Sequence, residues 1–110
     1  MHKKLIALLM FFSCIMVYAD DVVGKWKLSE VDWQDKTIVI GTIAFEESGT
    51  YIINHKDGKT ISNTWAIDGD FFTLAFHGFS IEWKSKNIFY LIPAFGGSEG
   101  KKYIFIREQI

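Results

Sequence analysis

His55 and His77 are the two histidines after position 19, and histidine is the residue type that most often serves in acid–base catalysis and metal binding. Each stands at or beside a turn: His55 precedes the turn signal Asp57-Gly58, and His77 directly precedes Gly78. His55 and Asp57 would supply two metal ligands, but no third or fourth ligand follows at a spacing that metal sites use. Because a histidine in a turn is normally solvated, the sequence predicts neither a metal site nor a general base here.

Two other sequence patterns could form a site for catalysis or for binding a charged group. Glu46 and Glu47 could form a carboxylate pair, but they stand in a turn, where solvation is the simpler interpretation. The glycine-rich loop over 96–100 could hold a phosphate, but it precedes a strand and lacks the lysine and helix N-terminus of phosphate loops. No serine or cysteine stands in a nucleophile-elbow motif. The sequence therefore predicts a non-enzymatic protein with no catalytic residue, no metal and no cofactor.

Aromatic and large apolar side chains are a stronger indication of binding. The candidates that face inward, as the core or as the floor of a cavity, are Trp26, Phe45, Tyr51, Trp65, Leu74, Ile81, Trp83, Leu91 and Phe105. Trp33 and Phe95 lie in connections, where packing does not require an aromatic ring, and so indicate a contact surface or a plug. The predicted ligand-binding residues are Trp33, Phe95, Tyr51, Trp65, Trp83 and Leu74.

Eight short segments must position these side chains, and none has a helical period. Alternation of apolar and polar residues predicts strands over 22–31, 37–45, 50–55, 59–67, 71–76, 79–84, 88–92 and 101–107. The segment 79–84 alternates most clearly, and Asp57-Gly58 is the strongest hairpin signal. Pro93 ends the seventh strand because it cannot donate to a ladder.

Short strands joined by tight turns predict an antiparallel meander. Closing the meander into an eight-stranded up-and-down barrel removes its two open edges, so an all-β barrel is the expected fold, with a two-sheet sandwich as the alternative. In a closed barrel the first and last strands are neighbours. The connections over 32–36, 56–58, 77–78 and 94–100 then gather at one end, which is the expected mouth.

Three segments together resemble a small bacterial lipocalin-like domain of the calycin type: Gly24-Lys25-Trp26, the stretch 64–70, and the terminal stretch 103–107. In that family the first-strand tryptophan plugs the closed end and an arginine after the last strand packs across it. The resemblance implies these closing roles for Trp26 and Arg107, with Gly24 opening the motif. It also implies binding of a small apolar or amphipathic ligand at the open end.

The N-terminus predicts export. Lys3 and Lys4 precede an apolar run that ends at Ala19, which is typical of a secretory signal peptide over 1–19 followed by one domain over 20–110. A membrane anchor is the alternative, but a spanning helix needs roughly 20 apolar residues. Cys14, the only cysteine, allows lipid attachment as a further alternative and excludes a disulfide. A secreted or periplasmic, disulfide-free domain favours a bacterial source.

The net charge of the predicted mature domain limits the classes of partner that it could bind. Two of the 12 basic residues lie in the predicted leader, which leaves ten against 13 acidic residues and a net charge of −3. These charges are scattered singly, so no nucleic-acid partner is expected, and membrane contact is expected only through the leader. The expected partner is a small apolar ligand. The alternative is a protein-interaction or structural domain of the cell envelope, with a solid core.

Overall fold

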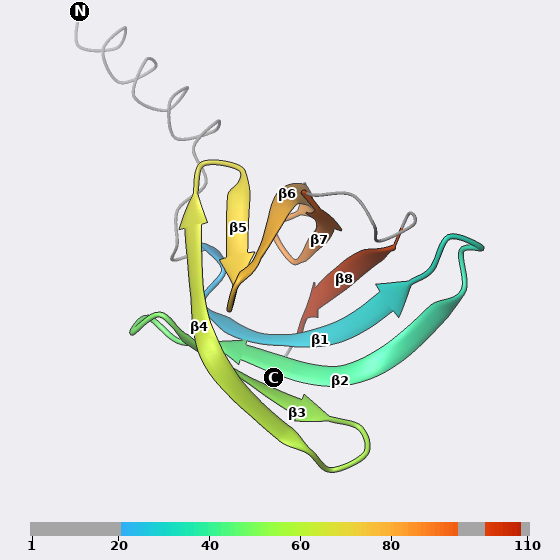
Figure 1. Cartoon of the computed structure of the whole chain (residues 1–110), viewed down its shortest axis with the longest axis horizontal. Coiled ribbons are helices and arrows are strands. Elements are labelled where there is room, and N and C mark those ends of the chain that lie inside the picture. The colour runs from blue at the N-terminus through green and yellow to red at the C-terminus, as the bar shows by residue number, and fades with distance from the viewer. Residues whose placement is uncertain (1–20, 95–100, 109–110) are drawn as a thin grey trace, which may run out of the picture.

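The structure, a computed structural model, describes residues 21–94 and 101–108. Eight antiparallel strands follow one another around a closed barrel (Figure 1). Their bounds are β1 Gly24–Val31, β2 Thr37–Phe45, β3 Thr50–His55, β4 Thr60–Asp68, β5 Phe71–Leu74, β6 His77–Ser85, β7 Ile88–Pro93 and β8 Lys102–Arg107. This confirms the eight-stranded barrel and rules out the two-sheet sandwich. The predicted leader with Cys14, the predicted site residue Phe95 and the loop over 96–100 lie outside the described residues.

Pairing of β1 with β8 closes the barrel, as the sequence predicts. The register runs from Trp26 opposite Arg107, through Leu28 opposite Phe105, to Val31 opposite Lys102. The two strands therefore satisfy each other's backbone groups along most of their length, and the meander keeps no open edge at this point.

Interlocked aromatic rings fill the interior at one end. The rings of Phe89 and Phe105 stack with centroids 4.5 Å apart, and Trp26 meets Phe89 edge-on at 4.7 Å. Such arrangements stabilise a core beyond the burial of area alone. The largest fully buried side chains are Trp26, Phe45, Phe72, Phe89, Phe105, Ile43, Leu91 and Val22.

A bulge and a glycine lie together in β2, where it begins to pair with β3. Leu28 pairs with Gly41 but Ser29 pairs with Val39, so Ile40 is the extra residue. A Cβ atom at Gly41 would lie 2.1 Å from the carbonyl oxygen of Asn54, a separation that no side chain tolerates. Glycine thus lets the two strands approach closely at the bend, and the β1–β2 hairpin then runs on past the end of β3 (Figure 1).

The turn between β5 and β6 differs from the predicted one. The sequence placed a strand over 71–76 and a turn at His77-Gly78, whereas β5 ends at Leu74 and His77 already begins β6, opposite Leu74. The turn consists of Ala75 and Phe76, and Ala75 adopts a left-handed φ of 54° that sequence reasoning reserves for glycine. The predicted turn was based on Gly78, but Gly78 lies within the β5–β6 ladder, paired with Thr73.

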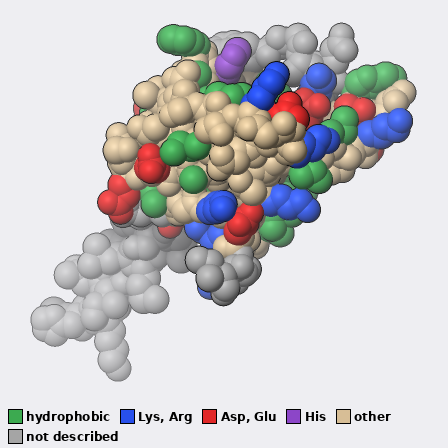
Figure 2. Space-filling model, turned by 90° about the horizontal axis from the view of Figure 1, so that it is seen from below, with side chains coloured by type: hydrophobic (Ala, Val, Ile, Leu, Met, Phe, Trp, Pro, Cys, Tyr) green, Lys and Arg blue, Asp and Glu red, His purple; other side chains and the backbone are tan. Residues whose placement is uncertain are grey.

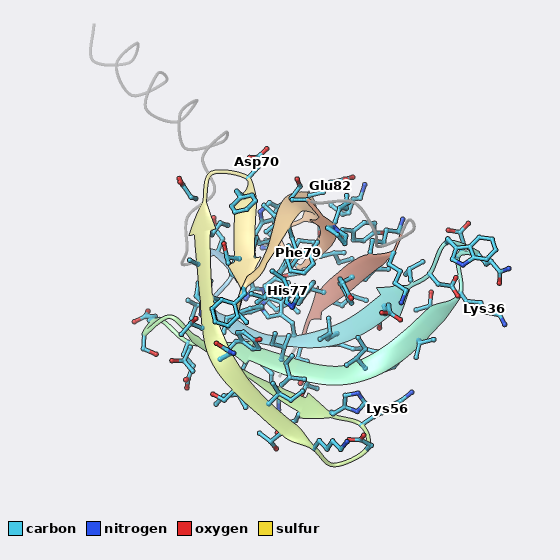
Figure 3. The ribbon with its side chains drawn as sticks, viewed as in Figure 1. Lys36, Lys56, Asp70, His77, Phe79 and Glu82 are labelled. Carbon is cyan, nitrogen blue, oxygen red and sulfur yellow. The ribbon has the colours of Figure 1, made fainter. Side chains whose placement is uncertain are left out.

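This correction moves His77 from a turn onto the wall of the barrel. Phe79 and Ile81 are buried, and strand alternation puts His77 on the same face two residues earlier. Figure 3 shows His77 and Phe79 following each other along β6. His77 therefore lies at the rim of the interior.

Candidate functional site

One end of the barrel is closed by Trp26 and Arg107. The guanidinium carbon of Arg107 lies 4.1 Å from the centroid of the Trp26 ring, a cation–π contact. The Arg107 Nη atoms donate to the carbonyl oxygens of Asp21 at 2.6 Å and Val23 at 3.2 Å. The buried Trp26 Nε1 donates to the Val22 carbonyl at 2.8 Å. The segment before β1 is thus held across this end, which side chains fill.

Gly24 belongs to the same arrangement. Its φ of 132° is one that L-residues rarely adopt, and a Cβ atom there would lie 3.0 Å from Arg107 Nη1. A side chain at this position would strain the backbone and crowd the guanidinium at once. The glycine, the tryptophan two residues later and the distant arginine therefore depend on one another.

Two predicted ligand-binding tryptophans lie in this closed half. Trp65 stacks on Phe72 with centroids 5.8 Å apart, and its Nε1 donates to the carbonyl of Glu46, in the turn that leads into β3, at 3.0 Å. Trp83 lies edge-on to Trp26 at 6.2 Å. Both rings are integral to the packed core beneath the open half. Within the described chain, the Trp83 indole N–H is buried without a hydrogen-bond partner.

The other predicted ligand-binding residues lie at different levels. Tyr51 is buried opposite Phe45 in the β2–β3 ladder, and burial raises the pKa of its phenol. Leu74 is half-buried at the mouth end of β5. Trp33 lies in the β1–β2 turn and is 65% exposed. Trp33 therefore lies at the mouth end but outside the core, whereas Leu74 lies directly opposite Trp65, at the top of the packed half.

The upper interior is apolar but incompletely covered. Ile53 and Ile61 face each other across β3 and β4, and Ile61 is 47% exposed. Ile38, near the start of β2, is 46% exposed. Phe79 is buried edge-on to Tyr103, with ring centroids 5.9 Å apart. By strand alternation these side chains lie on the inner face at the open end of the barrel, which is here called the opening.

The wall of this opening is uneven in height. Strand β4 begins at Thr60 but pairs with β5 only from Trp65 to Asp68. The hairpins β1–β2 and β3–β4 therefore extend beyond the β5–β6 turn, and their tips carry Lys36 and Lys56 (Figure 3). The opening is lowest at β5 and β6, where His77 lies.

Sequence reasoning missed an acidic residue in this opening. Glu30 lies opposite Tyr103 in the β1–β8 ladder, and Lys101 Nζ lies 3.9 Å from its carboxylate. Burial raises the pKa of the Tyr103 phenol, and the charge of Glu30 and a hydrogen bond to it raise the pKa further. Alternate residues of a strand share a face, so Glu30 lies on the same inner face as Trp26 and Leu28. The alternation could therefore have identified Glu30, but a glutamate is normally expected to face solvent.

Neither histidine has partners for catalysis or metal binding in the described chain. His55 Nδ1 accepts the backbone N–H of Asp57 at 3.3 Å and lies 3.1 Å from its carboxylate, which is a contact within one turn. His77 is exposed. Among residues 21–94 and 101–108, no three His, Cys, Asp or Glu side chains gather as a metal site would need.

Exposed hydrophobic side chains complete the surface. They are Trp33, Ile38, Val39, Ile61, Phe71, Phe76, Ile92 and Ile106. On the face seen in Figure 2, hydrophobic groups are separated by charged and neutral side chains. Phe76, at 96% exposure, is the most exposed of the set.

Comparison with protein-family models and with curated proteins finds no match for this chain. The closed eight-stranded antiparallel barrel is consistent with a calycin-like fold. In the portion of the chain that the structure covers, no helix has the length and apolarity to span a bilayer. One fold hosts many functions, so the function of this barrel depends on the residues at its open end.

Proposed function

We propose that this chain is an exported, lipocalin-like protein that binds a small apolar or amphipathic ligand in the open half of its barrel. The observation that carries the proposal is the division of the interior. The closed half is filled by fully buried rings, whereas apolar side chains above it, including Ile38 and Ile61, stay exposed to water. A ligand that covers them would remove apolar area from water, at about 25 cal/mol per Å².

The polar groups of the opening suit an amphipathic ligand. The Glu30 carboxylate and the Tyr103 phenol lie together on one side of the mouth, near Lys101. A few polar groups in an otherwise apolar site fix the orientation of a ligand. The polar end of the ligand would lie at this cluster and its apolar body along Ile53 and Ile61.

A second candidate function is docking of a protein partner at the same end. It is favoured by the exposed rings of Trp33 and Phe76, which lie on two hairpin turns, since exposed aromatic residues are common in contact surfaces. In that case the core would simply be solid, and the protein would be an interaction or structural domain of the cell envelope.

Titration with oleic acid, dodecylamine and an apolar dye, followed by tryptophan fluorescence, tests the proposal. Saturable binding is expected for at least one probe. Ile61→Arg should abolish binding because it places a charge in the opening, whereas Phe76→Ser, on the exposed turn, should leave the affinity within about twofold, as for an interface residue that makes no ligand contact. Circular dichroism would show that both variants fold. A folded barrel that gives no saturable signal with any probe would contradict ligand binding and favour docking.

A further inference from the structure

Basic residues are confined to one half of the barrel wall. Strands β2, β3, β4 and β5 contain no lysine or arginine. Lysines project outward from the other half: Lys25 and Lys27 alternate with buried residues of β1, Lys84 is exposed on β6, and Lys102 starts β8. The acidic residues among them are Glu82, which contacts Lys84, and Glu108, whose backbone N–H donates to the Lys25 carbonyl. This half is positive, although the whole chain has a net charge of −1.

The same half of the wall has outward-facing aliphatic residues. Strands β7 and β8 alternate between residues buried in the core and residues on the outside, which are Ile88, Tyr90, Ile92, Ile104 and Ile106. Ile88 pairs with Ile106 and Tyr90 with Ile104, so these side chains are adjacent on the surface. More than a third of the surface of Ile92 and of Ile106 is exposed.

The lysines lie over and beside these apolar residues. The Nζ atoms of Lys84 and Lys102 lie 5.0 Å and 5.1 Å from the centroid of the Tyr90 ring. Lys27 pairs with Ile106 across β1 and β8. The outer face of β6, β7, β8 and β1, here called the basic wall, thus combines aliphatic side chains with long cationic ones whose stems can cover them.

We infer that the basic wall docks on the surface of an anionic phospholipid bilayer. Its charge complements such a surface, and its isoleucines would enter the headgroup region while the lysine ammonium groups stay among the phosphates. The composition favours lipid over a protein partner, because protein interfaces are enriched in arginine and depleted in lysine. The inference concerns the outside of the barrel and does not depend on ligand binding in the opening. The basic wall would thus contact a membrane in addition to the contact that the sequence predicts for the leader.

Vesicle co-sedimentation tests the inference with phosphatidylcholine alone and with a mixture of phosphatidylcholine and phosphatidylglycerol. The wall variant is Lys25→Gln/Lys27→Gln, which changes two exposed side chains and leaves the Tyr90 contacts intact. The matched control is Lys36→Gln/Lys56→Gln, which removes the same charge from the two hairpin tips (Figure 3). All three proteins share residues 1–20, so any contribution of that segment is equal.

We expect wild type and control to bind the anionic vesicles more strongly than the neutral ones, by a margin that falls as salt rises. Binding to the neutral vesicles measures the contribution of the shared N-terminal segment. Each lysine near an anionic surface strengthens binding about fivefold, so the wall variant should partition about 25-fold more weakly. Equal losses in wall variant and control, or no binding to anionic vesicles, would overturn the inference. Binding to soluble polyglutamate without binding to vesicles would overturn it too and indicate an acidic protein partner.

Discussion

At the residue scale, the closed end rests on a set of mutual contacts between Trp26, Arg107 and Gly24. The tryptophan ring receives the guanidinium on one face and donates its N–H to the Val22 carbonyl. The Arg107 guanidinium also donates hydrogen bonds to the Asp21 and Val23 carbonyls. Because Trp26 is fully buried while Arg107 is half-buried, the ring shields the cation–π contact partly from solvent, which strengthens it.

A double-mutant cycle on Trp26 and Arg107 measures this contact. Trp26→Leu should lower the free energy of unfolding by about 2–4 kcal/mol, because it removes buried volume. Arg107→Ala should cost less, and the two changes together should cost about 1 kcal/mol less than their sum, which is the cation–π coupling. Urea unfolding gives the three values. Strict additivity would show that the two side chains stabilise the barrel independently.

Some of the residues at the two ends of the barrel could be predicted from the sequence, and others could not. Trp26 and Arg107 could be placed together because resemblance and strand order agree. Glu30 was missed because a carboxylate on an inner row contradicts the usual preference of its residue type. The glycine after His77 predicts a turn there, whereas in the structure Ala75 adopts the positive φ of the turn.

At the element scale, periodicity predicted all eight strands but not how they bend. The bulge at Ile40 and the close approach at Gly41 depend on the packing of β2 against β3, which no local pattern reports. The unequal strand lengths, with four residues in β5 and nine in β4, set the low side of the opening. These features decide where a ligand could enter, so the mouth could be located from sequence only coarsely.

Alanine substitutions at two glycines separate close approach from backbone conformation. Gly41→Ala should lower the free energy of unfolding by about 2–3 kcal/mol, because its φ is 155° and its Cβ would in addition meet the Asn54 carbonyl oxygen. Gly58→Ala is the matched control: its φ is 98°, but a Cβ atom there meets nothing within 4 Å. It should cost about 1–2 kcal/mol from backbone strain alone. An equal cost at the two positions in urea unfolding would show that β2 and β3 can separate slightly at the bend.

At the scale of the whole molecule, the barrel combines three surfaces with different chemistry. The closed end is filled by rings, the open end has partly exposed apolar side chains, and the basic wall has lysines beside isoleucines. The sequence predicted the barrel and its closing strands, because alternation and open-edge avoidance act on the entire chain. It did not predict the basic wall, since residues scattered singly along the chain gather only when four strands lie side by side.

The export proposed above requires a defined mature N-terminus. Arg107 and Trp26 donate hydrogen bonds to the carbonyls of Asp21 and Val22, and processing after Ala19 would keep both of these residues. Intact mass of the exported protein should therefore correspond to a chain that begins at Asp20. Ala19→Arg should block processing, because cleavage requires a small residue there. An exported protein that keeps residues 1–19, or one with a diacylglyceryl group on Cys14, would contradict the prediction and place the barrel on a membrane anchor.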